Sequence, residues 1–349
     1  MHAPSPAPAP ADGPVAPDRI MQMAWGFALT RALSTSLELE LFRHVAEGKR
    51  TPAELSKACA ATPRGVAMLV DALVGVGLLL RAGAGREAPV SLAPDTDLFL
   101  VKGKPSYLGD FVLFHSSFID AQWRSLTPTV RTGRPPVALD RPAEGVPVWH
   151  QLVDSLFALG FRAAQQVGRE LEARHPGKAL RLLDVAAGSG VWGIGAATTN
   201  PRLRATFQDL PETLTHATRW VERMGLGDRA DYLPGDLRET DFGTARFDAA
   251  ILGHICHSEG AEASRRLFAK VARALTPGGT IVVVEFVPNP DRNGPSLPLL
   301  FALNMLVNTT EGDTFTFPEY AAWLAAAGFR DVRQVDAPAP SPLIFATKA

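Results

Sequence analysis

The sequence predicts an α/β fold class in which a mainly helical domain precedes the α/β domain. Helical patterns and one short hairpin fill the chain up to about residue 105, whereas strands and helices alternate from Leu180 onward. The length of 349 residues also favours two domains, since one domain averages about 150 residues. The expected segments are a disordered tail at 1–17, a winged-helix domain at 18–105, a helical linker at 106–176 and an α/β domain at 177–349.

The overall composition excludes several classes of protein. Apolar residues make up 46% and charged residues 20% of the sequence, which are globular values. The net charge of −1 gives no electrostatic footprint for nucleic acid or for an anionic membrane. No run approaches the roughly 18 consecutive apolar residues of a membrane span, and 1–17 lacks the features of a signal peptide. Two distant cysteines, Cys59 and Cys256, fit a reducing cytoplasm.

The winged-helix prediction rests on helical segments followed by a weak hairpin. One or two amphipathic helices are expected over Ile20–Val45, because apolar residues recur there at helical spacing. A further helix starts at Thr51-Pro-Ala-Glu54, where Thr, Pro and Glu suit the cap, first and third positions. Another is expected from Thr62 to Leu80. The hairpin pairs Leu78–Arg81 with Val90–Ala93.

A winged helix invites a DNA-binding interpretation, but the charges argue against it. Residues 1–100 hold nine Lys/Arg and ten Asp/Glu. The second helix of the expected pair, 64–79, carries Arg64 as its one basic residue. A recognition helix needs side chains that contact phosphates and base edges. The favoured interpretation is therefore a packing or dimerisation module.

Aromatic helices and then strands follow this domain. Residues 106–175 are expected to be helical, with a proline-rich loop at 132–147, and Pro176-Gly177 marks the boundary to the α/β domain. The expected strands are Leu180–Val185, Ala205–Asp209, Ala230–Tyr232, Phe247–Leu252 and Thr280–Phe286. Helical stretches separate most of them, which is the pattern of a parallel sheet.

Three acids stand near the carboxyl ends of the first three strands. Asp184 precedes the glycine-rich turn Ala186–Gly190, Asp209 ends the second strand, and Asp236 follows the third. The turn lets a ligand approach the backbone closely, and it is no phosphate loop because no Gly-Lys-Ser/Thr follows. An acid after the second strand suits ribose hydroxyls, and one after the third suits an adenine amino group. Together they describe an adenosine-type ligand laid across the sheet edge.

On these motifs the chain resembles the class I S-adenosylmethionine (SAM)-dependent methyltransferases. More narrowly, it resembles the dimeric small-molecule O-methyltransferases, which include plant caffeate and hydroxyindole enzymes and bacterial natural-product enzymes. The resemblance covers about residues 18–349 and implies a Rossmann-like methyltransferase domain after a dimerising winged helix. It implies SAM as the cofactor, bound at Asp184, Ala186, Gly188, Ser189, Gly190, Asp209, Leu210, Gly235, Asp236, Leu237 and Gly253.

Three positions of the cofactor site depart from the family pattern. Ala186 and Ala187 replace glycines, which the loop tolerates if φ is negative there. Gly253 stands where relatives often have Lys or Arg near the cofactor.

The resemblance also implies a general base and its orienting carboxylates. The base histidine of the family falls on His257 rather than His254, and a histidine, with an ordinary pKa near 6.5, suits removal of a phenol or enol proton. Glu285 matches the first orienting carboxylate. The second falls on Thr314, where either Asp313 or Glu311 substitutes; Asp313 is the third catalytic candidate.

An apolar helix is expected over Leu297–Val307 and is on its pattern a core helix; the resemblance implies instead that it walls the acceptor pocket. The expected acceptor-contacting residues are Phe157, Phe161, His254, Phe301, Asn304, Met305 and Asn308. The group His254, His257, Glu259 and Glu285 is alternatively a set of metal ligands, although the favoured expectation is no metal.

The leading hypothesis is a SAM-dependent O-methyltransferase that methylates a hydroxyl of a small aromatic or polyketide-like secondary metabolite. It predicts a cytoplasmic homodimer, joined through the N-terminal domain, with a small-molecule acceptor and no nucleic-acid or membrane partner. The alternatives are C-methylation on the same fold, including a metal-assisted 2-oxo acid type, a SAM-binding winged-helix regulator, and a nicotinamide oxidoreductase.

Overall fold

The computed structural model describes residues 15–349, so most of the expected tail at 1–17 lies outside the described residues. The described chain divides into two compact units, the first ending at Ala121 and the second running from Gln122 to Ala349. Residues 122–176 therefore belong to the same compact unit as the C-terminal α/β region.

The first unit is helical apart from one hairpin. Its helices are α1 (Asp18–Ala24), α2 (Gly26–Glu38), α3 (Leu41–Ala46), α4 (Pro52–Ala58), α5 (Pro63–Gly75), α6 (Pro94–Leu100) and α7 (Gly109–Phe114), followed by a π-helical turn, η1 (His115–Ile119). The antiparallel hairpin joins β1 (Leu79–Arg81) and β2 (Val90–Leu92). The predicted capping box at Thr51 and Glu54 is confirmed, and so is the hairpin.

Two predictions about this unit were wrong in their boundaries. The segment Ile20–Val45 forms three helices, with a break at Trp25 and another at Glu40, which takes a left-handed φ of 49°. Helix α5 ends at Gly75, because Gly77 turns left-handed and the next N–H, that of Leu78, bonds back to Leu73. This is a Schellman ending, which a glycine just past a helix predicts.

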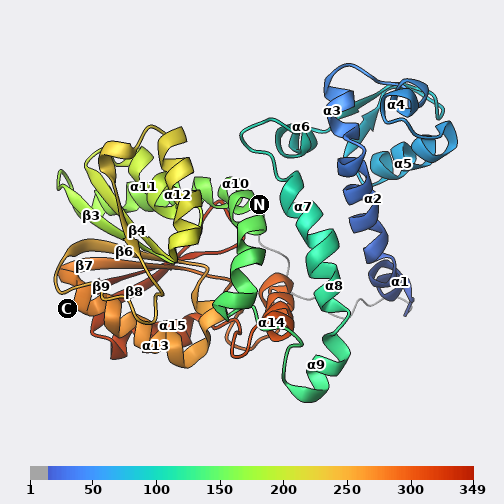
Figure 1. Cartoon of the computed structure of the whole chain (residues 1–349). Coiled ribbons are helices and arrows are strands. Elements are labelled where there is room, and N and C mark those ends of the chain that lie inside the picture. The colour runs from blue at the N-terminus through green and yellow to red at the C-terminus, as the bar shows by residue number, and fades with distance from the viewer. Residues whose placement is uncertain (1–14) are drawn as a thin grey trace. The chain divides into compact units, whose positions relative to one another are not determined.

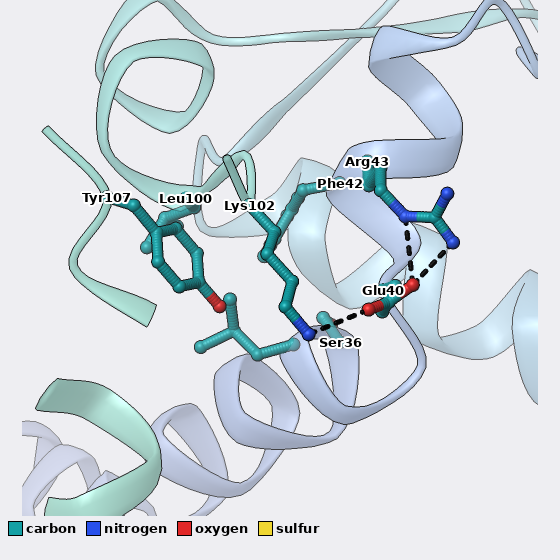
Figure 2. A pocket seen from close by; sticks show the side chains of 8 residues that line it. Ser36, Glu40, Phe42, Arg43, Leu100, Lys102 and Tyr107 are labelled. Carbon is teal, nitrogen blue, oxygen red and sulfur yellow. Dashed lines mark hydrogen bonds and ion pairs between the residues drawn. The ribbon is translucent and has the colours of Figure 1, made fainter. Parts of the chain in front are cut away.

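Glu40, just after the end of α2, forms ion pairs with Arg43 of α3 and with Lys102, which follows α6. Figure 2 shows its carboxylate between Arg43 and Lys102, with the ammonium of Lys102 3.0 Å away. The hollow beside this ion pair holds about 10 Å³, which is room for roughly one water molecule. We therefore assign no ligand to it.

The second unit is a seven-stranded sheet between two layers of helices. Its strands are β3 (Leu180–Val185), β4 (Leu203–Asp209), β5 (Ala230–Pro234), β6 (Phe247–Gly253), β7 (Leu275–Val284), β8 (Phe329–Val335) and β9 (Leu343–Lys348). Its helices are α9 (Leu126–Thr132), α10 (Pro142–Arg174), α11 (Val191–Thr199), α12 (Pro211–Arg223), α13 (Cys256–Ala274), α14 (Ser296–Asn308) and α15 (Phe317–Ala326), while α8 (Asp120–Trp123) spans the division between the units.

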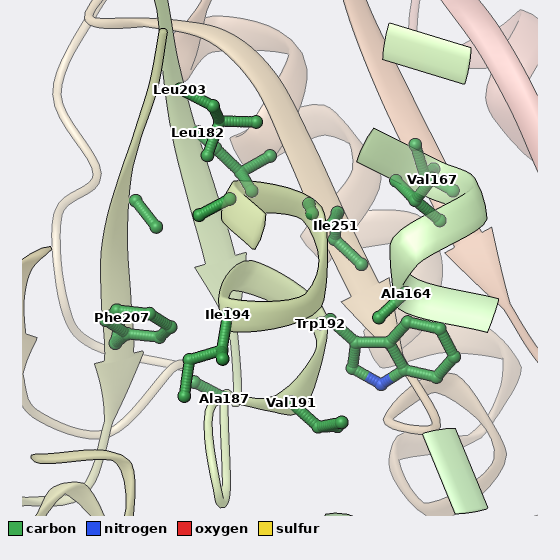
Figure 3. Packing of buried hydrophobic residues seen from close by; sticks show 14 of the residues in the cluster. Ala164, Val167, Leu182, Ala187, Val191, Trp192, Ile194, Leu203, Phe207 and Ile251 are labelled. Atoms are coloured by element: carbon green, nitrogen blue, oxygen red, sulfur yellow. The ribbon is translucent and has the colours of Figure 1, made fainter. Parts of the chain in front are cut away.

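The strand order is β5-β4-β3-β6-β7-β9-β8, with β9 and β8 antiparallel to their neighbours. Helices cover both faces of the sheet (Figure 1). Alternate residues of the central strands belong to two different cores, one on each face. Leu182 and Ile251 pack against α10 and α11 in one core (Figure 3). Leu183 and Leu252 pack against α13 and α15 in the other.

The five predicted strands exist, four of them with ends within two residues of the prediction. The fifth, β7, runs over Leu275–Val284 instead of Thr280–Phe286, and β8 and β9 were not predicted. Residues 142–147 were predicted as loop and are helical, because Pro142 opens α10 and Pro147 lies within its first two turns, where few intrahelical N–H bonds are lost. Among the described residues no single helix is both long and apolar enough to span a membrane. The α4–α5 pair reaches that composition only jointly, across a bend of 116°.

Candidate active site

The glycine-rich turn that follows β3 contains residues with left-handed backbone conformations. The φ angles are 52° at Ala186, 56° at Gly188 and 73° at Gly190, which precedes the first residue of α11. The condition of a negative φ, under which the loop was expected to tolerate the two alanines, is therefore met at Ala187 and not at Ala186. An alanine in this region carries backbone strain of order 1–3 kcal/mol, so the rest of the loop must hold it in place.

Asp209, at the end of β4, holds this loop. Its carboxylate accepts the N–H of Gly188 at 2.8 Å and the N–H of Leu210 at 2.7 Å. Burial raises the pKa of Asp209 to about 6, although these two hydrogen bonds oppose the rise. The second strand therefore presents a partly buried carboxyl directly beside the loop.

Asp184, within β3, is fully buried beneath the loop. Its Oδ2 accepts the N–H of Gly193 at 2.8 Å, and its Oδ1 has no partner among the described residues. Burial raises the pKa of Asp184 to about 8, so this carboxyl is protonated near neutrality. Ser189, in the loop above it, is also buried.

The segment after β5 completes this edge of the sheet. Gly235 has a φ of 142°, and its carbonyl accepts the side-chain N–H of Gln208 at 2.7 Å. Asp236 caps the next turn by accepting the N–H of Arg238, and the carbonyl of Leu237 accepts from Lys270.

These residues fit an adenosine-type cofactor. Because β3, β4 and β5 are neighbours in the sheet, their three acids lie in sequence along one edge. The edge offers a left-handed glycine backbone, a carboxylate at Asp209 for hydroxyl groups, and an unpaired buried oxygen on Asp184. Ligands bind at this edge in open α/β sheets.

His257 and Glu285 form a buried pair after the ends of β6 and β7, two neighbouring strands on the side of β3 away from β4. Nδ1 of His257 lies 2.7 Å from Oε2 of Glu285, and the backbone N–H of His257 donates to Oε1 at 3.2 Å. Glu285 is fully buried and directly follows β7. Burial opposes its ionisation, but the charge and hydrogen bonds of His257 hold the pKa of Glu285 below its usual value.

His254 is the weaker partner of the same carboxylate. Its Nδ1 lies 3.9 Å from Oε2 of Glu285, and burial lowers the pKa of His254 to about 4. It is therefore neutral near pH 7, and its backbone takes a left-handed φ of 58° as the chain leaves β6. One ligand atom from each of His254, His257 and Glu285 lies within 4.8 Å of the others.

The structure does not bring Asp313 to the imidazole ring. Its carboxylate accepts the N–H of Thr314 at 2.7 Å and lies 3.7 Å from Arg292. Its backbone N–H donates to the backbone carbonyl of His257 at 2.9 Å. Asp313 therefore contacts the backbone of His257 and not its imidazole ring. The hydroxyl of the buried Thr314 bonds to Pro298.

Aromatic rings surround His257. Phe301 of α14 meets its ring edge-on with centroids 4.9 Å apart, and Phe286 packs against Phe301 at 4.2 Å. The ring of His254 lies 5.0 Å from that of Phe286. Phe286 was not predicted as a site residue because it falls inside an expected strand.

The other expected acceptor residues divide into two groups. Asn304 accepts the indole N–H of Trp123 at 2.9 Å and lies beside Asn308, while Met305 is buried on the same helix. Phe157 stacks on Trp220 of α12 at 3.7 Å, with Phe161 stacked on Phe157, so this pair packs toward α12. We therefore do not group the two phenylalanines with His257.

The sequence matches the models of a known family in both units. A family model described as an O-methyltransferase domain matches residues 123–330, and an O-methyltransferase dimerisation domain matches residues 21–102. The chain belongs to the O-methyltransferase family.

Individual members are similar along nearly the whole chain. The tetracenomycin polyketide synthesis 8-O-methyl transferase of Streptomyces glaucescens is 32% identical over 339 residues, covering 95% of this methyltransferase and 97% of the relative. The 3-hydroxy-5-methyl-1-naphthoate 3-O-methyltransferase of Streptomyces sahachiroi is 28% identical over 321 residues, covering 91% of each chain. The human N-acetylserotonin methyltransferase, solved in complex with SAM, shares the fold with a TM-score of 0.80 and 24% identity, covering 98% of this chain and 100% of that chain.

Proposed function

We propose that this methyltransferase transfers a methyl group from SAM to a hydroxyl of a small aromatic or polyketide-like metabolite, with His257 as general base. One observation carries the proposal: the buried contact of 2.7 Å between His257 and Glu285. A carboxylate at Nδ1 fixes the imidazole tautomer and stabilises the imidazolium that forms when the base takes a proton. Nε2 is then the nitrogen left to accept the proton of the acceptor hydroxyl.

The remaining roles follow from the chemistry of each position. SAM supplies an activated methyl group, so the protein needs to align and deprotonate the acceptor. Asp209 would hold ribose hydroxyls, the loop from Ala186 to Gly190 the methionyl part, and Asp236 the adenine amino group. Phe286 and Phe301 give the neighbourhood of His257 an apolar, aromatic wall, which suits a conjugated acceptor.

The relatives favour the same class of acceptor. The relative from Streptomyces glaucescens acts in polyketide synthesis, and the relative from Streptomyces sahachiroi takes a naphthoate. The naphthoate carries a ring hydroxyl group, and the ring-lined position of His257 would accommodate an acceptor of this kind.

Replacement of His257 by alanine tests the base directly. We expect turnover to fall by about 10²–10⁴-fold while SAM affinity changes little, because His257 lies outside the β3–β5 edge. Turnover on a metabolite panel with isotopically labelled SAM, followed by mass spectrometry, measures the effect. Full turnover of the variant, at a pH below the pKa of the acceptor hydroxyl, would show that another group is the base.

A metal ion is the second candidate for this cluster, because ligand atoms of His254, His257 and Glu285 lie within 4.8 Å of one another. A metal-assisted C-methyltransferase would lose activity to a chelator and recover it with iron. It would also lose as much activity on His254→Ala as on His257→Ala. Activity that survives the chelator supports the general-base mechanism.

We also propose a homodimer formed through the first unit and a cytoplasmic location. Helices α1 and α2, together with Trp25 between them, expose large apolar side chains that include Phe27 and Leu29, and such a patch marks an interface. The two free cysteines, Cys59 and Cys256, support a reducing compartment.

Deletion of residues 1–100 should expose apolar surface and give aggregates or a poorly folded monomer. Light scattering of the truncated and full-length proteins measures this outcome. A soluble, active monomer from the deletion would contradict a dimerisation role.

A further inference from the structure

Trp192 occupies the space beside Gly253 where a side chain would otherwise stand. A Cβ atom added to Gly253 would lie 2.1 Å from Nε1 and 2.3 Å from Cδ1 of the indole. Trp192 is in the first turn of α11 and is 5% exposed. Gly253 is therefore a glycine because the indole of Trp192 packs against its backbone, at the carboxyl end of β6.

The indole N–H is a hydrogen-bond donor without a partner. None of the described residues accepts a hydrogen bond from it, and its nitrogen is not one of the buried polar atoms that lack a partner, so a ligand can reach it. Figure 3 shows the nitrogen on the edge of the indole that faces away from Val167 and Ile251. The centroids of the indole and of the His254 ring are 6.0 Å apart, so the indole lies close to the His254–His257 cluster.

The sheet order places this donor between the two halves of the site. Asp209 ends β4, the loop follows β3, and the His257–Glu285 pair lies beyond β6 and β7. If the ribose lies at Asp209 and the acceptor at His257, the methionyl end of SAM lies over the ends of β3 and β6. Trp192 and Gly253 stand at that position.

We propose that the Nε1–H of Trp192 donates a hydrogen bond to the α-carboxylate of the cofactor. The inference rests on the proposed function, because it takes SAM as the ligand. The methionyl end carries a sulfonium, an ammonium and a carboxylate, and an indole N–H, which only donates, can pair with the carboxylate alone.

The test compares two ligands that differ by the amino-carboxypropyl group. S-Adenosylhomocysteine carries the α-carboxylate, and 5′-methylthioadenosine lacks it. The variant Trp192→Phe keeps an aromatic ring and removes the N–H. We expect it to bind S-adenosylhomocysteine roughly 10-fold or more weakly, as for a hydrogen bond to a charged group. Its affinity for 5′-methylthioadenosine should not change.

Trp220→Phe is the matched control, because the indole N–H of Trp220 is already paired with Asp154 at 3.0 Å. Calorimetry should show that this control variant has no selective loss of affinity for S-adenosylhomocysteine. Equal affinities of wild type and Trp192→Phe for S-adenosylhomocysteine, or an equal loss for both ligands, would overturn the proposal. If wild-type protein binds neither ligand, the proposed SAM-dependent function itself fails, and the inference fails with it.

A second measurement does not depend on the folding of a variant. In wild-type protein labelled with ¹⁵N-tryptophan, the indole resonance of Trp192 should shift downfield when S-adenosylhomocysteine is added. The smaller ligand should leave that resonance without the downfield shift. An indole proton that responds identically to both ligands would contradict the carboxylate contact.

Discussion

Asp184 and Glu285 are both fully buried carboxyl groups near the carboxyl edge of the sheet, yet their ionisation differs. Glu285 receives an imidazole at 2.7 Å and a backbone N–H, and the pKa of Glu285 lies below its usual value. Asp184 receives one backbone N–H, and burial together with nearby Asp209 raises the pKa of Asp184 to about 8.

The difference shows that the partner, and not burial alone, decides the charge of each carboxyl group. Burial disfavours both carboxylates, but a cationic or hydrogen-bonding partner can reverse the effect. The catalytic side of the edge thereby keeps an anion that can stabilise an imidazolium. The cofactor side keeps a neutral acid under the loop.

Among substitutions of the buried carboxyl groups, the largest effect is expected from removing the charge on the catalytic side. Glu285→Gln keeps a hydrogen-bond partner for His257 but loses the charge that stabilises the imidazolium, so turnover should fall, although by less than the roughly 10²–10⁴-fold loss expected for His257→Ala. The acid limb of the pH–rate profile should also move to lower pH, since the imidazolium forms less readily. An unchanged profile and rate would remove Glu285 from the mechanism.

A smaller effect is expected on the cofactor side, at Asp209. Asp209→Ala removes a charged acceptor for the ribose hydroxyls, worth roughly 1.5–3 kcal/mol, which is about a 10- to 100-fold loss of SAM affinity. Because the pKa of Asp209 is about 6 in the free protein, wild-type affinity should also fall as the pH drops below that value. Calorimetry across this pH range measures both effects, and a variant with wild-type affinity would remove Asp209 from the ribose site.

Motifs carried by local sequence were predictable, and contacts set by packing were not. The capping box at Thr51 follows from residue types at fixed positions, whereas the pairing of His257 with Glu285 was expected from the resemblance to the methyltransferase family. The left-handed φ of Ala186 was not predictable, because alanine rarely adopts it and only the surrounding loop enforces it.

The same limit applies to the roles of single side chains. Asp313 was chosen for its charge, but Arg292 and Thr314 engage its carboxylate away from the ring. Trp192 was not predicted as a site residue, although the sequence shows a tryptophan shortly after the glycine-rich loop and a glycine at position 253. Only the packing of the indole on that glycine joins the two observations.

At neutral pH the smallest effect is expected from making Asp184 permanently neutral, because this carboxyl group is already protonated there. Since the pKa of Asp184 is about 8 in the folded protein and about 3.9 in an unfolded chain, the folded state binds more protons between these values. The free energy of unfolding should therefore decrease as the pH rises from about 4 to about 8 and level off above. Asp184→Asn keeps an acceptor for the N–H of Gly193 and cannot ionise, so its unfolding free energy should vary less with pH. Urea unfolding at several pH values compares the two slopes. Equal slopes would mean that Asp184 is already ionised in the folded protein, and that the two buried carboxyls do not differ as described.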